Sequence, residues 1–136
     1  MANWLPFSIF ALFSFGLWGL FTKLAVEYID FNSALVYQTL GVIVVGFISL
    51  SLVKFKPEVS VKGFSFALLT GVTYALGCLF YFLAASKGKI VTVVTLTALY
   101  PLVTIIIAYF LLKEPLSLQQ ICGIGLALIA ILLMSF

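Results

Sequence analysis

The chain has 136 residues, of which 65% are hydrophobic and 8% are charged, and its formal net charge is +3. Soluble domains are about half apolar, so this composition excludes an ordinary soluble domain. The small and scattered positive charge indicates no nucleic-acid partner. Both cysteines, Cys78 and Cys122, lie inside apolar stretches, which excludes a disulfide framework and a metal site.

Five apolar stretches follow one another along the chain, and nearly every charge lies between them. They cover residues 4–26, 33–53, 63–86, 90–112 and 117–136. A helix needs about 20 mostly apolar residues to cross a bilayer. Long continuous runs favour helices over the short alternating strands of a barrel. We predict an all-α membrane protein with five transmembrane helices, forming a single transmembrane domain over 1–136.

The first stretch is predicted to be a retained helix rather than a cleaved signal peptide. It has no basic segment before it and no small-residue cleavage pattern, and its apolar run is longer than a signal-peptide core. The connections between stretches are short, which predicts that consecutive helices pack as antiparallel neighbours. Ser117 and Gln120 match a capping box that would begin the last helix.

The lysines give a weak orientation signal. Cytoplasmic ends of membrane proteins carry an excess of Lys and Arg. Four of the seven basic residues lie on the side of the N-terminus and three on the other side: Lys54, Lys56, Lys62 and Lys113 against Lys23, Lys87 and Lys89. Two interpretations stay open, a single weakly set orientation and a dual topology in which the chain inserts both ways.

Polar and small residues share one side of each of the first four predicted helices. Such residues turn toward protein or a water-filled cavity, because lipid is as apolar as leucine. We predict that the following side chains line a common cavity as substrate-binding residues: Trp18, Thr22, Gln38, Tyr74, Tyr81, Thr97 and Tyr100. The alternative is that the hydroxyls simply bond backbone carbonyls within the bundle.

The fifth stretch has almost no polar side, which predicts a peripheral or interface helix. Its Gly123 and Ala127 form a pair of small residues suited to close contact with another helix.

Pro101 and Lys23 carry two interpretations each. Pro101 lies inside the fourth stretch, so a bend is expected there, either as a hinge or as a static kink. Lys23 and Glu27 stand four residues apart near the end of the first helix and can pair. Lys23 is then either an anchor at the membrane interface or a charge at the mouth of the cavity.

Two segments resemble the EamA-type proteins of the drug/metabolite transporter superfamily. Residues 17–25, LWGLFTKLA, are similar to the opening helix of that family. The stretch from Thr95 onward is closer still, with TLTALYPLVT followed by AYFLLKEPLS at 108–117. The family pattern is a Tyr-Pro pair, an apolar run, a Glu ending the helix, a short cap and a glycine-bearing last helix. Its matches here are Tyr100, Pro101, Glu114, Gly123 and Gly125.

Typical members of that family carry two five-helix repeats and transport small metabolites. The resemblance covers the whole chain, which corresponds to one such repeat, and implies a homodimer that rebuilds the ten-helix unit, with antiparallel chains if both orientations form. It implies an integral, multi-pass transporter or facilitator of a small organic metabolite in a prokaryotic inner membrane. Substrate, direction and energy coupling do not follow from it, and no cofactor or metal is expected.

The same residues argue for or against other classes of function. Exporters of the small multidrug resistance type use a carboxylate in the middle of the first helix, where this chain has Ser14, Phe15 and Gly16. That difference argues against a proton-coupled cation exporter. A non-transporting membrane assembly subunit stays open, because the apolar fifth stretch suits it equally well. An enzyme is not expected, since the sequence offers no nucleophile–base pair, no set of metal ligands and no histidine.

Overall fold

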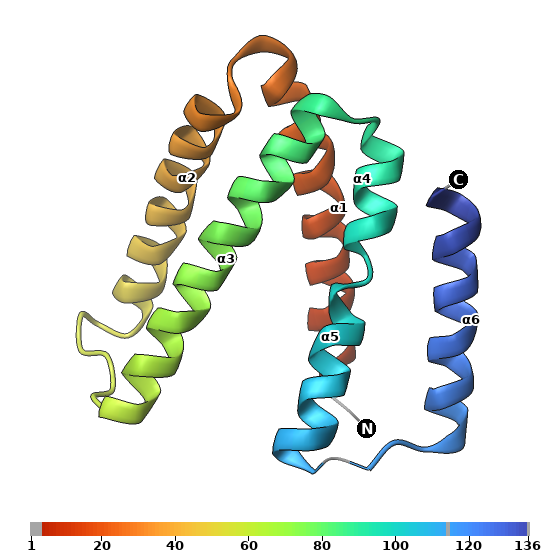
Figure 1. The fold of residues 1–136 in the computed structure, drawn as a ribbon. Helices are drawn as coiled ribbons and strands as arrows, with labels where there is room; N and C mark the ends of the chain where they lie inside the picture. Colours follow the sequence, from red (N-terminus) through yellow and green to blue (C-terminus); the bar gives the residue numbers. More distant parts are fainter. Residues whose placement is uncertain (1–3, 114, 136) are drawn as a thin grey trace. The chain divides into compact units, whose positions relative to one another are not determined.

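The computed structural model describes residues 4–113 and 115–135, and the regular elements in these residues are helices. In chain order they are α1 (Leu5–Tyr28), α2 (Phe31–Leu52), α3 (Val61–Lys87), α4 (Ile90–Thr97), α5 (Tyr100–Ile107), the π-helix η1 (Ala108–Leu112) and α6 (Leu118–Ser135) (Figure 1). The predicted all-α membrane class is confirmed. Glu114, which the family pattern singles out, lies outside the described residues.

Among the described residues, four segments are long and apolar enough to cross a membrane. They are Leu5–Tyr28, Phe31–Leu52, Val61–Lys87 and Ile90–Leu112. The last of them combines α4, α5 and η1. The apolar part of α6, Leu118–Met134, is shorter than these four. A membrane crossing by the fifth predicted stretch therefore stays a prediction.

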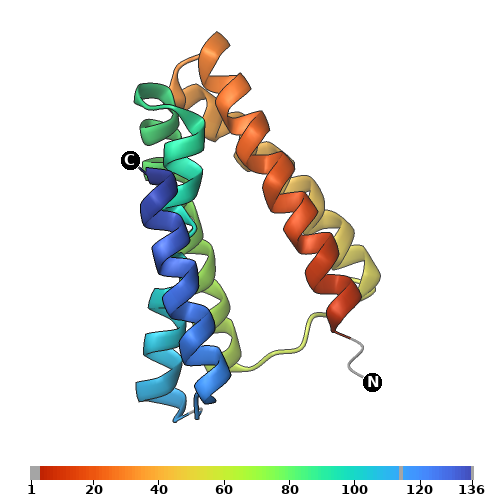
Figure 2. The ribbon, with the colours of Figure 1, turned by 90° about the vertical axis from the view of Figure 1, so that its right-hand side faces the viewer.

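The chain divides into two compact units, Met1–Lys87 and Gly88–Phe136. In the first unit, α1, α2 and α3 approach one another at the end that holds the α1–α2 connection and separate toward the other end (Figures 1 and 2). The core of this unit lies at the close end, where Ala34, Cys78 and Phe82 are buried. Side chains from all three helices therefore meet around that end.

The second helix begins at a side-chain cap. Asp30 is the N-cap of α2, and its carboxylate accepts hydrogen bonds from the backbone N–H of Ser33 at 3.0 Å and from the Ser33 hydroxyl at 2.8 Å. These bonds hold the pKa of Asp30 below its usual value, because they favour the charged carboxylate. An acidic N-cap also complements the positive end of the helix dipole.

In the second unit, α6 packs against α4 and begins at the predicted capping box. The backbone N–H of Ser117 donates to the Gln120 Oε1 at 2.8 Å, and the Gln120 N–H donates back to the Ser117 hydroxyl at 3.2 Å. The capping box is thereby confirmed. It satisfies backbone donors that the first turn of a helix leaves without partners.

The fourth predicted helix is interrupted rather than continuous over 90–112. α4 ends at Thr97, Ala98 and Leu99 form a turn, and α5 begins at Tyr100. The cause is Pro101, which lacks an N–H and whose ring clashes with the carbonyl four residues earlier, that of Thr97. The expected bend at Pro101 thus takes the form of a break in the helix just before it.

Candidate functional site

The clearest polar contact between helices joins Trp18 of α1 to Gln38 of α2. The indole Nε1 of Trp18 donates a hydrogen bond of 2.7 Å to the Gln38 Oε1, and both side chains are half-buried. An indole N–H can only donate, so the amide must turn its oxygen toward the ring. The amide nitrogen of Gln38 then remains as a donor for another group.

Tyr81 of α3 packs against the same indole. The ring centroids of Trp18 and Tyr81 lie 4.5 Å apart, and that of Phe82 lies 6.5 Å from Trp18 in an edge-on arrangement. Tyr81 is only 8% exposed. Its ring therefore supports Trp18 from the interior of the unit, and one residue from each of α1, α2 and α3 meets at this point.

Thr22 lies one turn beyond Trp18 on α1 and is 3% exposed. Its hydroxyl donates to the carbonyl of Trp18 at 2.9 Å. This is the backbone bonding that the sequence left open as an alternative for hydroxyl residues. The structure brings Thr22 beside the contact of Trp18, Gln38 and Tyr81, with its donor already used within its own helix.

The other predicted site residues are placed differently. Tyr74 lies two turns before Tyr81 on α3 and is 44% exposed. Thr97 and Tyr100 belong to the second unit, where Tyr100 is 65% exposed and the Thr97 hydroxyl donates to the Val93 carbonyl at 2.8 Å. Convergence of all seven predicted residues on one cavity stays a prediction, as does the role of Pro101 as a hinge.

Lys23 has a role that the sequence did not foresee. Its Nζ donates to the carbonyl of Ala85 at 3.1 Å, and Ala85 is completely buried. The last four carbonyls of a helix lack partners within it, and Ala85 belongs to the last turn of α3. Lys23 therefore caps α3 and places a positive charge at the negative end of its dipole. A pairing of Lys23 with Glu27 and a role at a cavity mouth stay predictions.

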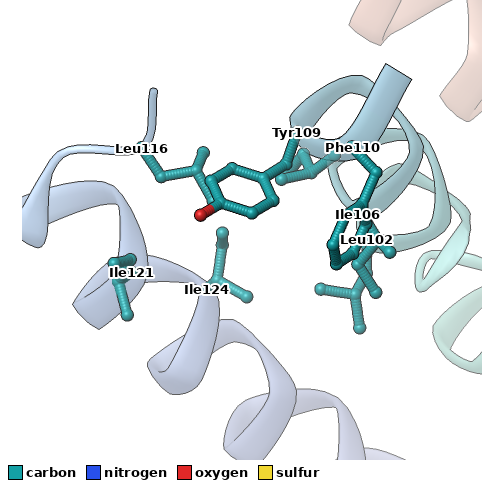
Figure 3. Close-up of a pocket in the computed structure, with 8 residues that line it drawn as sticks. Leu102, Ile106, Tyr109, Phe110, Leu116, Ile121 and Ile124 are labelled. Carbon is teal, nitrogen blue, oxygen red and sulfur yellow. The ribbon is translucent and has the colours of Figure 1, made fainter. Parts of the chain in front are cut away.

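A groove lies within the second unit, between α6 and the segment of α5 and η1. One part has a volume of about 230 Å³, and an adjoining part about 420 Å³. Tyr109 reaches across it toward Leu116 and Ile124 (Figure 3). The lining is almost wholly apolar, with the Tyr109 hydroxyl and the Gln120 amide as its polar groups.

Gly123 and Ala127 line the second part of this groove. A Cβ added at Gly123 would meet no atom within 4 Å. The close helix contact expected of this pair is therefore not made by another helix of the described chain. The two small residues, four apart in sequence, instead lie on the side of α6 that lines the groove.

Sequence reasoning missed two residues that hold the first unit together. Ala34 and Phe82 are among its most buried side chains, and neither has a polar group that would mark it. In an apolar helix, small and aromatic residues on the buried side resemble those on the lipid side. The available signal was helical spacing, since Phe82 follows Cys78 by four residues and Ala34 precedes Gln38 by four.

One comparison with known proteins names a family. The model of the EamA-like transporter family matches residues 2–136. An uncharacterized protein of Methanocaldococcus jannaschii is 36% identical over 74 residues, which make up 54% of this chain and 54% of that protein. The match thus spans about half the length of this relative. No solved structure matches the chain significantly.

Proposed function

The chain belongs to the EamA-like transporter family, and from that premise we propose that it carries a small organic metabolite across the membrane, as a transporter or facilitator. The family match covers all of the described residues, and the membrane-spanning segments are those a multi-pass carrier needs. Particular residues indicate the chemistry of the solute and the assembly that transports it.

The observation that carries the proposal is the contact between Trp18, Gln38 and Tyr81. Polar side chains inside membrane helices are costly unless they are paired, and here the pairing joins separate helices. The indole offers a flat face for an apolar part of a solute, and the remaining amide donors of Gln38 offer hydrogen bonds. Such a combination suits a neutral or zwitterionic solute.

We further propose that the working unit is a homodimer with its chains in opposite orientations. Typical members of the family carry two five-helix repeats, whereas this chain resembles one. The four-to-three division of its basic residues gives little preference for either orientation. The Methanocaldococcus relative is of similar length, because the same 74 residues make up equal shares of both chains.

The proposal is tested with the full chain in proteoliposomes and a panel of amino acids, sugars and amphiphilic cations. We expect saturable flux of one class of solute, reduced about tenfold or more by Trp18→Ala, since stacking and hydrogen-bond contacts are lost together. Phe13→Ala is the matched control, because Phe13 lies on the same helix with 64% of its side chain exposed.

Each other outcome points to a named alternative. Flux of cations alone, driven by a proton gradient, would favour an exporter of the small multidrug resistance type. Neither flux nor binding across the whole panel would contradict transport and favour a membrane assembly subunit. Equal losses in Trp18→Ala and Phe13→Ala would contradict the assignment of the site.

A further inference from the structure

Two backbone carbonyls in the span Ile90–Leu112 lack the bond that a continuous helix would give them. Pro101 has no N–H, so the carbonyl of Thr97 has no donor four residues further along. The N–H of Leu102 donates to the Leu99 carbonyl at 3.0 Å instead of reaching that of Ala98. The carbonyl oxygens of Thr97 and Ala98 are therefore acceptors without their α-helical donors.

No side chain of residues 4–113 and 115–135 donates to either carbonyl in their place. The Thr97 hydroxyl is directed back along α4, where it donates to the Val93 carbonyl at 2.8 Å and to the Val94 carbonyl at 3.1 Å. Thr97 and Ala98 are both exposed within the described chain. Irregular backbone at membrane depth persists only where it is covered by protein or lines a water-filled cavity. The carbonyls of Thr97 and Ala98 therefore need a hydrogen-bond donor from outside this segment.

We propose that the Thr97 and Ala98 carbonyls form a subsite for a primary ammonium group of the solute. This inference rests on the proposed transport function and names the chemistry of one part of the solute. Two carbonyls accept two N–H bonds, and the C-terminal end of α4 is the negative end of its dipole, which favours a positive donor. Tyr100, two residues after Ala98, is exposed, and aromatic faces attract ammonium groups.

The span itself contains no carboxylate that could hold such a cation. Backbone carbonyls supply the attraction in its place and recognise the N–H groups as well as the charge. A quaternary ammonium carries the same charge without any N–H, so it cannot make these bonds. Isopropylammonium and tetramethylammonium form a matched pair of probes, since they share one charge and a similar size.

One isotopic label isolates the Thr97 carbonyl. The sequence contains a single Thr–Ala step, Thr97–Ala98. Threonine labelled with ¹³C at the carbonyl, combined with ¹⁵N-alanine, therefore gives one coupled pair in solid-state NMR of the full chain in lipid bilayers. We expect isopropylammonium chloride to shift the Thr97 carbonyl resonance saturably, while tetramethylammonium chloride leaves it in place.

A variant of Pro101 tests whether its missing N–H creates the subsite. Pro101→Ala restores the missing N–H, so the Thr97 resonance moves to a helical position without ligand. The apparent affinity for isopropylammonium should then fall about tenfold or more, as for loss of a hydrogen bond to a charged group. Pro6→Ala is the matched control, because Pro6 lies at the start of α1, where proline removes no helical bond.

The inference is overturned if isopropylammonium leaves the Thr97 resonance unchanged, or if tetramethylammonium shifts it equally. These measurements need only the unaltered chain, so they test the ammonium subsite even if Pro101→Ala fails to fold. Flux in proteoliposomes separates the two proposals. Flux of a primary amine without a response of Thr97 contradicts the subsite alone, whereas a response without flux of any solute contradicts transport alone.

Discussion

Trp18 and Gln38 are 20 residues apart in sequence, and the hydrogen bond of 2.7 Å between their side chains links α1 to α2. Most other side chains of these two helices are apolar, and apolar contacts do not favour one orientation over another. A directed bond of this kind fixes the rotation of α1 relative to α2. It also orients the amide of Gln38, whose nitrogen is then presented in a defined direction.

A double-mutant cycle measures this bond. Trp18→Phe and Gln38→Leu each remove one partner, and we expect a coupling free energy between about 0.6 kcal/mol, the mean for hydrogen bonds between membrane helices, and about 1.7 kcal/mol, the largest measured. Reversible unfolding in mixed detergent and SDS gives the free energies of unfolding of the four proteins. Tyr37→Leu, at an exposed position beside Gln38, serves as the control partner for Trp18→Phe. Simple additivity of Trp18→Phe and Gln38→Leu would show that the bond adds nothing to the free energy of unfolding.

A substitution of Ala85 by Leu should destabilise the first unit. Ala85 is 0% exposed, so added methylene groups have no free space and must displace α1 or α3. We expect a loss of about 1–3 kcal/mol in the free energy of unfolding, typical of overpacking. Ala75→Leu is the control, because Ala75 lies on the same helix with its side chain exposed. Equal effects of the two variants would contradict the packing described for Ala85.

The cap of α2 should weaken in acid. The folded pKa of Asp30 is lowered from 3.8, so its stabilising contribution is present above that value and is lost as the pH falls through the lowered pKa. A ¹³C carboxyl titration by NMR measures the pKa. Ser33→Ala removes the hydroxyl donor but keeps the backbone donor, and should bring the pKa part of the way back. An unchanged titration in Ser33→Ala would mean that the Ser33 hydroxyl does not bond the carboxylate.

Reporter fusions at the termini should detect both orientations of the chain if it has dual topology. Replacing Lys54 and Lys56 by Gln leaves two basic residues on the side of the N-terminus and three on the other, so the population should shift toward placing Lys87 and Lys89 in the cytoplasm. Glu58→Gln alters the same connection, and acidic residues contribute little to orientation. A C-terminus found on one side only in the unaltered chain would refute dual topology.

Local signals in the sequence were the most reliable ones. The capping box at Ser117 and Gln120 could be predicted because its partners are three residues apart and bond within one turn. Pro101 likewise predicted a local bend in its helix, since the missing N–H is a property of the residue itself. The extent of the break could not be predicted, because it depends on which carbonyl the N–H of Leu102 selects.

The sequence predicted which side of each helix faces the other helices, but not which residues touch one another. Trp18, Gln38 and Tyr81 were all assigned to inward sides, yet helical spacing gives no relative height of the helices in the membrane. The bond from Lys23 to Ala85 spans 62 residues and ends on a backbone carbonyl, which every residue possesses. No side-chain pattern can mark such an acceptor.

The bond from Lys23 to Ala85 also has a consequence for biogenesis. During synthesis α1 leaves the ribosome long before the end of α3 exists, so Lys23 must first be accommodated without this acceptor. Until that turn is present, a lysine side chain of this length can keep its ammonium group near the lipid headgroups. Nascent chains that end before Ala85 lack this acceptor.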